Sequence, residues 1–114
     1  DQISRKFAAL ISRKLSLEKV ILFGSTAKRN DRLYSDLDIC LIGNKEKVSK
    51  KQRDLIGTIV ADYLIDHSIV INWIYFNEKQ WENAKTPIIP TIKQEGKLLW
   101  EKEKIESKSQ KVSL

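Results

Sequence analysis

Apolar and polar positions along the chain predict two amphipathic helices. Apolar residues at positions 3, 7, 10, 11 and 15 recur with the spacing of one helical face, so we expect a helix over residues 2–15. A second stripe within residues 48–64 predicts the longest helix, with Lys, Arg and Asp on its other side. Its apolar members are Leu55, Ile56, Ile59, Val60, Tyr63 and Leu64.

Three short runs rich in β-branched and aromatic residues predict strands over residues 19–23, 37–42 and 68–76. The first run stops at Gly24, and the second stops at Gly43-Asn44, as strands do when they enter turns. The third run is apolar at both alternating positions. This pattern indicates a strand covered on both faces, and we expect it to be a central strand.

The region after the third strand predicts two short helices and an edge strand. Asn77 with Gln80 three residues later is a variant of the capping box, so a helix should start there. Pro90 at a first helical position and Gly96 just past the end bracket a second helix. Residues 98–100 then supply an edge strand.

The chain should fold as one domain over residues 1–100. Its 114 residues and 41% hydrophobic content suffice for one core. Residues 101–114 are mostly Lys, Glu, Ser and Gln, and we expect a charged, flexible tail. No apolar stretch approaches the roughly 20 residues of a membrane-spanning helix, and a single cysteine fits a reducing compartment, so a soluble cytoplasmic protein without membrane contact is expected.

An excess of basic residues gives the chain a formal charge of +6, which favours polyanionic partners such as nucleotides or RNA. Much of the excess lies between Lys45 and Arg53. That run is interpreted as the solvated face and approach of a helix, with RNA contact as the alternative.

Asp36 and Asp38 carry the candidate chemistry. At positions i and i+2 of a strand, both carboxylates point to the same face, roughly 6.5 Å apart at Cα. Two such groups suit Mg²⁺, which prefers oxygen ligands and completes its shell with waters and phosphates. The alternative is a merely polar strand end. Cys40 has the same parity but lies deeper, and is predicted to be a core thiol.

Gly24-Ser25 provides a candidate phosphate-binding turn. Gly24 has no Cβ to block a phosphate, while backbone N–H groups and the Ser25 hydroxyl can donate to its oxygens. Lys28 and Arg29 add positive charge nearby. The alternative is an ordinary turn after a strand.

The segment FGSTAKRNDRLYSDLD, from Phe23 to Asp38, has ten residues between Ser25 and Asp36 and resembles the nucleotidyltransferase signature of the DNA polymerase β superfamily. It is most similar to the minimal members, and the likeness extends to about residue 100. The resemblance implies an α/β (α+β) nucleotidyltransferase fold, a small mixed sheet with helices packed on one side. It also implies ATP as substrate, one or two Mg²⁺ ions at Asp36 and Asp38, and transfer of AMP to a hydroxyl.

Two positions depart from the family pattern. Arg29 stands where members usually carry glycine. Asn72 stands at the position of the third carboxylate, counted back from the helix start at Asn77. Its amide oxygen could ligate a metal, although it carries no charge to hold a second ion. A hydrogen-bonded core amide is the alternative.

Small stand-alone members of this family are often antitoxins paired with a HEPN ribonuclease toxin, and some transfer AMP to a toxin tyrosine. The resemblance therefore implies a protein adenylyltransferase with an antitoxin role. Two alternatives stay open. The domain could bind nucleotide weakly and neutralise a toxin by contact alone, or it could be the N-terminal part of a larger nucleotidyltransferase.

Overall fold

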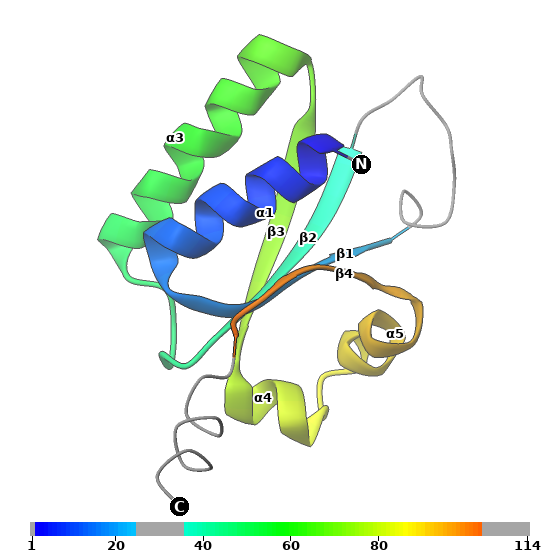
Figure 1. Cartoon of the computed structure of the whole chain (residues 1–114). Coiled ribbons are helices and arrows are strands. Elements are labelled where there is room, and N and C mark those ends of the chain that lie inside the picture. Colours follow the sequence, from blue (N-terminus) through cyan, green and yellow to red (C-terminus); the bar gives the residue numbers. More distant parts are fainter. Residues whose placement is uncertain (1, 25–35, 104–114) are drawn as a thin grey trace, which may run out of the picture.

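Within residues 2–24 and 36–103, which the computed structural model describes, the chain forms a four-stranded sheet with helices against both faces (Figure 1). Most of the predicted helices and strands are confirmed, with shifts at their ends. The elements in chain order are α1 (Gln2–Leu15), β1 (Leu17–Phe23), β2 (Asp36–Gly43), α3 (Lys50–His67), β3 (Val70–Asn77), α4 (Glu78–Asn83), α5 (Ile88–Glu95) and β4 (Lys97–Glu101).

The sheet is mixed, as expected, and its strand order is β3-β2-β1-β4. β1 pairs antiparallel with β2 on one side and with β4 on the other. β2 and β3 run parallel, and α3 makes the crossover between them. Parallel neighbours need such a crossover because a short turn can join only antiparallel strands.

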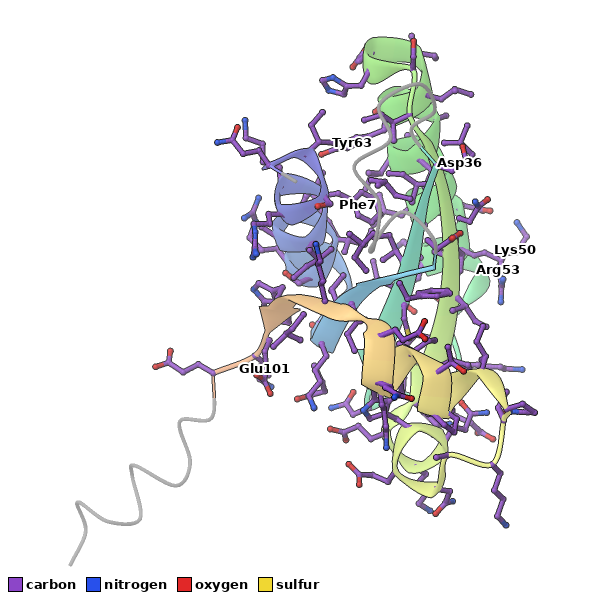
Figure 2. The ribbon with its side chains drawn as sticks, turned by 90° about the vertical axis from the view of Figure 1, so that its right-hand side faces the viewer. Phe7, Asp36, Lys50, Arg53, Tyr63 and Glu101 are labelled. Atoms are coloured by element: carbon purple, nitrogen blue, oxygen red, sulfur yellow. The ribbon has the colours of Figure 1, made fainter. Side chains whose placement is uncertain are left out.

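One face of the sheet packs against α1 and α3. Phe7, Ile11, Ile39, Leu41 and Ile56 are fully buried in the core between these layers. The rings of Phe7 and Tyr63 meet edge to face, with centroids 5.5 Å apart, and so tie α1 to α3 (Figure 2). This core fixes the back of β2, the strand that carries the two aspartates.

The other face packs against α4 and α5, so the expectation of helices on one side only was wrong in this respect. Figure 1 shows α1 and α3 on one side of the strands and α4 and α5 on the other. β2 is buried at consecutive positions from Ile39 to Gly43, so its side chains on both faces need cover. The second core comprises Ile21, Cys40, Ile42, Phe76, Trp81, Ile89 and Ile92.

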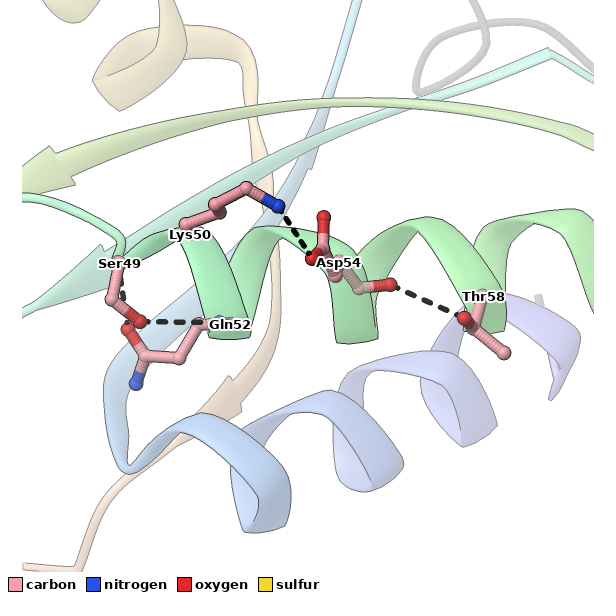
Figure 3. Close-up of polar contacts among 5 residues, drawn as sticks. All are labelled: Ser49, Lys50, Gln52, Asp54 and Thr58. Carbon is pink, nitrogen blue, oxygen red and sulfur yellow. Dashed lines mark hydrogen bonds and ion pairs between the residues drawn. The ribbon is translucent and has the colours of Figure 1, made fainter.

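Capping hydrogen bonds set where the helices begin. The N–H of Gln52 donates to Ser49 Oγ at 3.1 Å, and the N–H of Ser49 donates to Gln52 Oε1 at 3.1 Å, which forms a capping box ahead of α3 (Figure 3). Asn77 and Gln80 make the same reciprocal pair ahead of α4, which confirms the predicted helix start.

The prediction of a central strand over residues 68–76 was wrong, because β3 is an edge strand of the described sheet. Its two faces are nevertheless both partly covered. Ile71, Trp73 and Tyr75 pack toward the α1 and α3 side, while Ile74 and Phe76 belong to the α4 and α5 side. Apolar residues at both sets of alternating positions therefore indicate that both faces of the strand are covered. They do not indicate whether both of its edges are paired with other strands.

Pro90 was also misplaced by the sequence pattern. α5 begins at Ile88 with Pro87 as its N-cap, so Pro90 is the third helical residue. A proline fits there because the first four N–H groups of a helix have no partner within the helix. Gly96 does end this helix, and β4 does form an edge, as predicted.

Ordered contacts continue slightly past residue 100. β4 ends at Glu101, and the N–H of Lys102 donates to Glu18 O at 2.9 Å. Residues 104–114 of the expected tail lie outside the described residues. Among the helices that are described, none has both the length and the apolar character needed to cross a membrane.

Candidate functional site

Asp36 and Asp38 lie at one end of a sheet face, beyond the part that α4 and α5 cover. Going along β2, this face carries Asp36 and Asp38 first and then Cys40 and Ile42, which belong to the core under α4 and α5. Asp36 is exposed and Asp38 is half-buried. Figure 2 shows Asp36 at the end of β2 remote from those helices. The buried half of the strand thus anchors a half that presents two acids to solvent.

Gly24 holds the end of β1 directly against Asp38. Its φ is +84°, which is a left-handed conformation that glycine adopts without strain. A Cβ built on Gly24 would overlap Asp38 Oδ2, because Phe23 is paired with Asp38 across the two strands. Glycine is therefore required here both by the backbone and by the carboxylate. We expected the missing Cβ to make room for a phosphate, and in the structure that room is used by Asp38.

Asn72 lies beside Asp38 on the parallel neighbour β3. The two residues are Cα partners in the strand register, and Asn72 Nδ2 donates to Asp38 Oδ1 at 3.3 Å. Asn72 is exposed, so it is not the buried core amide of the alternative interpretation. The structure therefore brings together Gly24, Asp38 and Asn72 from three sequence regions, as the candidate site requires.

Three of the predicted nucleotide-binding residues, Ser25, Lys28 and Arg29, lie outside the described residues. Between Gln2 and Gly24 and between Asp36 and Glu103, no three His, Cys, Asp or Glu side chains gather closely enough to hold a metal ion. The polar groups at the described site are accordingly two carboxylates and one amide. These are oxygen donors that suit a hard divalent cation such as Mg²⁺.

The basic run from Lys45 to Arg53 is exposed, as expected of a solvated helix face and its approach. Lys50 Nζ pairs with Asp54 at 3.1 Å, and the Arg53 guanidinium lies over the Trp73 ring at 5.7 Å from its centroid. Trp73 packs toward the α1 and α3 side, so this contact is on the sheet face opposite Asp38. The basic run therefore does not line the described part of the aspartate site.

Cys40 is a core thiol, as predicted. It is fully buried one alternation deeper than Asp38, and burial raises the pKa of its thiol from the ordinary 9.0 to about 12. The thiol therefore stays protonated and unreactive at neutral pH.

Val70 is a neighbour of the site that sequence reasoning missed. It is the Cα partner of Asp36 and is 41% exposed, so an apolar side chain flanks the acids on β3. No signal in the sequence could have placed it there, because the parallel register of β2 and β3 depends on how α3 packs across the sheet.

Comparisons with known proteins identify the family of the chain. The family model described as "Polymerase beta, Nucleotidyltransferase" matches residues 5–105. A comparison with curated protein sequences finds no match.

Three solved structures share the fold at low sequence identity. A Sulfolobus solfataricus chain described as a candidate nucleotidyltransferase is 20% identical, with a TM-score of 0.53 and coverage of 90% of this chain and 81% of that one. A toxin–antitoxin structure with AMP-PNP is 17% identical (TM-score 0.61), and a mutant of the MntA-HpeT toxin–antitoxin pair is 15% identical (TM-score 0.59). Each of these two comparisons covers 87% of this chain and 74% of the other.

The family match over residues 5–105 spans nearly all of the described residues. This chain belongs to the polymerase beta nucleotidyltransferase family.

Proposed function

We propose that this domain is an Mg²⁺-dependent adenylyltransferase that transfers AMP from ATP to a hydroxyl, and that the acceptor is a tyrosine of a cognate HEPN toxin. The observation that carries the proposal is the placement of Asp36 and Asp38 on one open face, with Asp38 held against Gly24 at the end of β1. This is where the family signature brings a triphosphate and its cation together. The domain would then act as an antitoxin.

The proposed reaction is an in-line displacement at the α-phosphorus of ATP. The acceptor oxygen forms the new bond to phosphorus, the bond from phosphorus to the bridging oxygen breaks, and pyrophosphate leaves with that electron pair. The hydroxyl proton passes to solvent. A bound Mg²⁺ would supply charge neutralisation at the phosphate oxygens. Asp36 and Asp38 would hold it, and the acceptor would approach over the face that they share.

The similar structures support the choice of nucleotide and partner. One is a toxin–antitoxin structure with AMP-PNP, an analogue of ATP. The MntA-HpeT structure is of a mutant in which two aspartates, two positions apart, are replaced by glutamate. Asp36 and Asp38 have the same spacing in the same fold, which supports the proposal that they bind the cation.

A second candidate function is nucleotide binding without transfer, in which the domain neutralises its toxin by contact. The observation in its favour is Asn72, a neutral amide beside Asp38 where the family usually has an acid. Because Asn72 carries no charge and cannot accept a proton as a carboxylate does, transfer would be slowed.

Incubation of the proposed cognate HEPN toxin with the domain, Mg²⁺ and ATP labelled at its α-phosphate would test both candidates. The adenylyltransferase proposal expects label on a toxin tyrosine, located by peptide mass spectrometry. Asp38→Asn should abolish the label, while Asp62→Asn, an exposed change on α3, should leave it intact. A stable complex without label would support the binding function, and neither label nor complex would refute both.

A further inference from the structure

We propose that Asn72 is a positioning residue that fixes the Asp38 carboxylate and limits the nucleotide-bound site to one divalent cation. This inference rests on the proposed function, because it concerns the cation that accompanies the triphosphate. It assigns a specific consequence to the neutral side chain at this position.

The first observation is that both oxygens of Asp38 have a fixed neighbour. Oδ1 accepts the hydrogen bond from Asn72 Nδ2 at 3.3 Å, and Oδ2 lies over Gly24, where no Cβ stands in its way. The carboxylate is therefore held between β1 and β3, the two neighbours of β2. A hydrogen bond of this kind orients a metal-binding carboxylate from outside the metal shell.

The second observation is the polarity of the amide. Asn72 presents its NH₂ group to Asp38, and this group has no lone pair to offer a cation. An aspartate here would instead place a third negative charge next to Asp38, since the two residues are register partners. Asn72 thus gives Asp38 a hydrogen-bond donor at a position where an aspartate would repel it.

The third observation is the number of acidic ligands. Among the described residues, the site has two carboxylates and no group of three acids. Together with phosphate oxygens of the nucleotide, two carboxylates can ligate one divalent cation. A second cation about 3.5–4 Å from the first would need a further anionic protein ligand, which the amide of Asn72 does not supply. The described part of the site therefore favours a single ion.

Asn72 is also exposed and belongs to an edge strand, so its replacement should leave the fold intact. The effects of its variants can then be assigned to the site. Thermal unfolding without nucleotide checks that each variant still folds cooperatively, and only Asn72→Asp should show a lower midpoint, because its added charge repels Asp38.

The test counts bound Mn²⁺ in the presence of AMP-PNP, by electron paramagnetic resonance and by calorimetric titration. We expect one ion per chain for the wild type and two for Asn72→Asp. Asn72→Ala should keep one ion with an affinity weakened about 10-fold, the lower end of what loss of an orienting partner costs. Asn44→Asp makes the same chemical change on an exposed turn and should match the wild type.

Two ions in the wild type, one ion in Asn72→Asp, or an unchanged affinity in Asn72→Ala would each overturn this inference while leaving nucleotide binding in place. Failure of the wild type to bind AMP-PNP at all would instead refute the proposed function, and this inference with it. The two failures are therefore distinguishable in one set of titrations.

Discussion

Asp38 Oδ2 occupies the volume that a side chain on Gly24 would need. The two residues come from neighbouring strands, and Phe23, which precedes Gly24, is the Cα partner of Asp38. Because Gly24 also has a φ of +84°, the end of β1 and the candidate metal ligand are coupled. Any substitution that moves Gly24 should therefore also move Asp38, and the reverse should hold.

Gly24→Ala should therefore damage both stability and the site. A residue other than glycine with positive φ costs about 1–3 kcal/mol, and the new methyl group would push Asp38 away. Urea unfolding measures the first effect, and titration of AMP-PNP with Mg²⁺ measures the second.

Gly57→Ala is the matched control for this change. Gly57 is an exposed residue within α3, and a Cβ built there meets nothing within 4 Å. Alanine is the better helix former, so stability should rise by about 0.5–1 kcal/mol with nucleotide binding unaltered. If both variants behave alike, the close approach of Gly24 to Asp38 has no energetic weight.

The local elements could be predicted well because short-range chemistry determines them. The helix over residues 2–15 is found with the predicted bounds, and the reciprocal bonds of Asn77 and Gln80 follow from residue types three positions apart. The shared face of Asp36 and Asp38 needs only the alternation of a strand.

Features that depend on long-range packing could not be predicted in the same way. The edge position of β3 was missed because its apolar residues reflect cover of its two faces by helices and give no information about pairing along its outer edge. The pairing of Asp36 with Val70 and of Asp38 with Asn72 depends on the parallel register that α3 imposes. The placement of Asn72 was anticipated through the family resemblance and through its polarity within an otherwise apolar strand.

Asp36→Asn and Asp38→Asn should each reduce the stabilisation that nucleotide gives the protein. A ligand that binds only the folded state stabilises it by an amount that grows with the logarithm of the ligand concentration over Kd, so losing a carboxylate should reduce the shift. We expect the affinity for AMP-PNP with Mg²⁺ to fall at least about 10-fold. Differential scanning fluorimetry with and without the ligand measures this.

Asp62→Asn controls for the loss of one negative charge, since Asp62 is exposed on α3, which packs on the sheet face opposite Asp38. Its ligand-induced shift should equal that of the wild type. Equal shifts in all three variants would argue against a role for Asp36 and Asp38 in binding the cation.

Ser49→Ala should destabilise α3 by removing one half of its capping box (Figure 3). The N–H of Gln52 would lose its acceptor, which costs about 1 kcal/mol and lowers the unfolding midpoint by about 4 °C in a domain of this size.

Thr58→Ala is the control for Ser49→Ala. Thr58 Oγ1 bonds back to Asp54 O at 3.2 Å on an exposed turn, and alanine should leave the midpoint unchanged or slightly raised. A midpoint that falls equally in both would show that the cap adds nothing beyond helix propensity.

Alkaline pH should unfold the protein partly through Cys40. Its pKa is about 12 in the folded chain against an ordinary 9.0, so the unfolded chain loses this proton first. The stability linked to the buried neutral thiol is therefore complete below pH 9 and is lost progressively as the pH rises toward 12. Between about pH 8 and about pH 10.5, this amounts to about 2 kcal/mol. Burial also raises the pKa of Tyr63 and Tyr75, so their titration also lowers the stability of the folded chain as the pH rises.

The wild type must therefore be compared with Cys40→Ala, in which only the thiol contribution is missing. Urea unfolding at both pH values should show a smaller loss for Cys40→Ala, and equal losses would mean that the thiol titrates alike in both states.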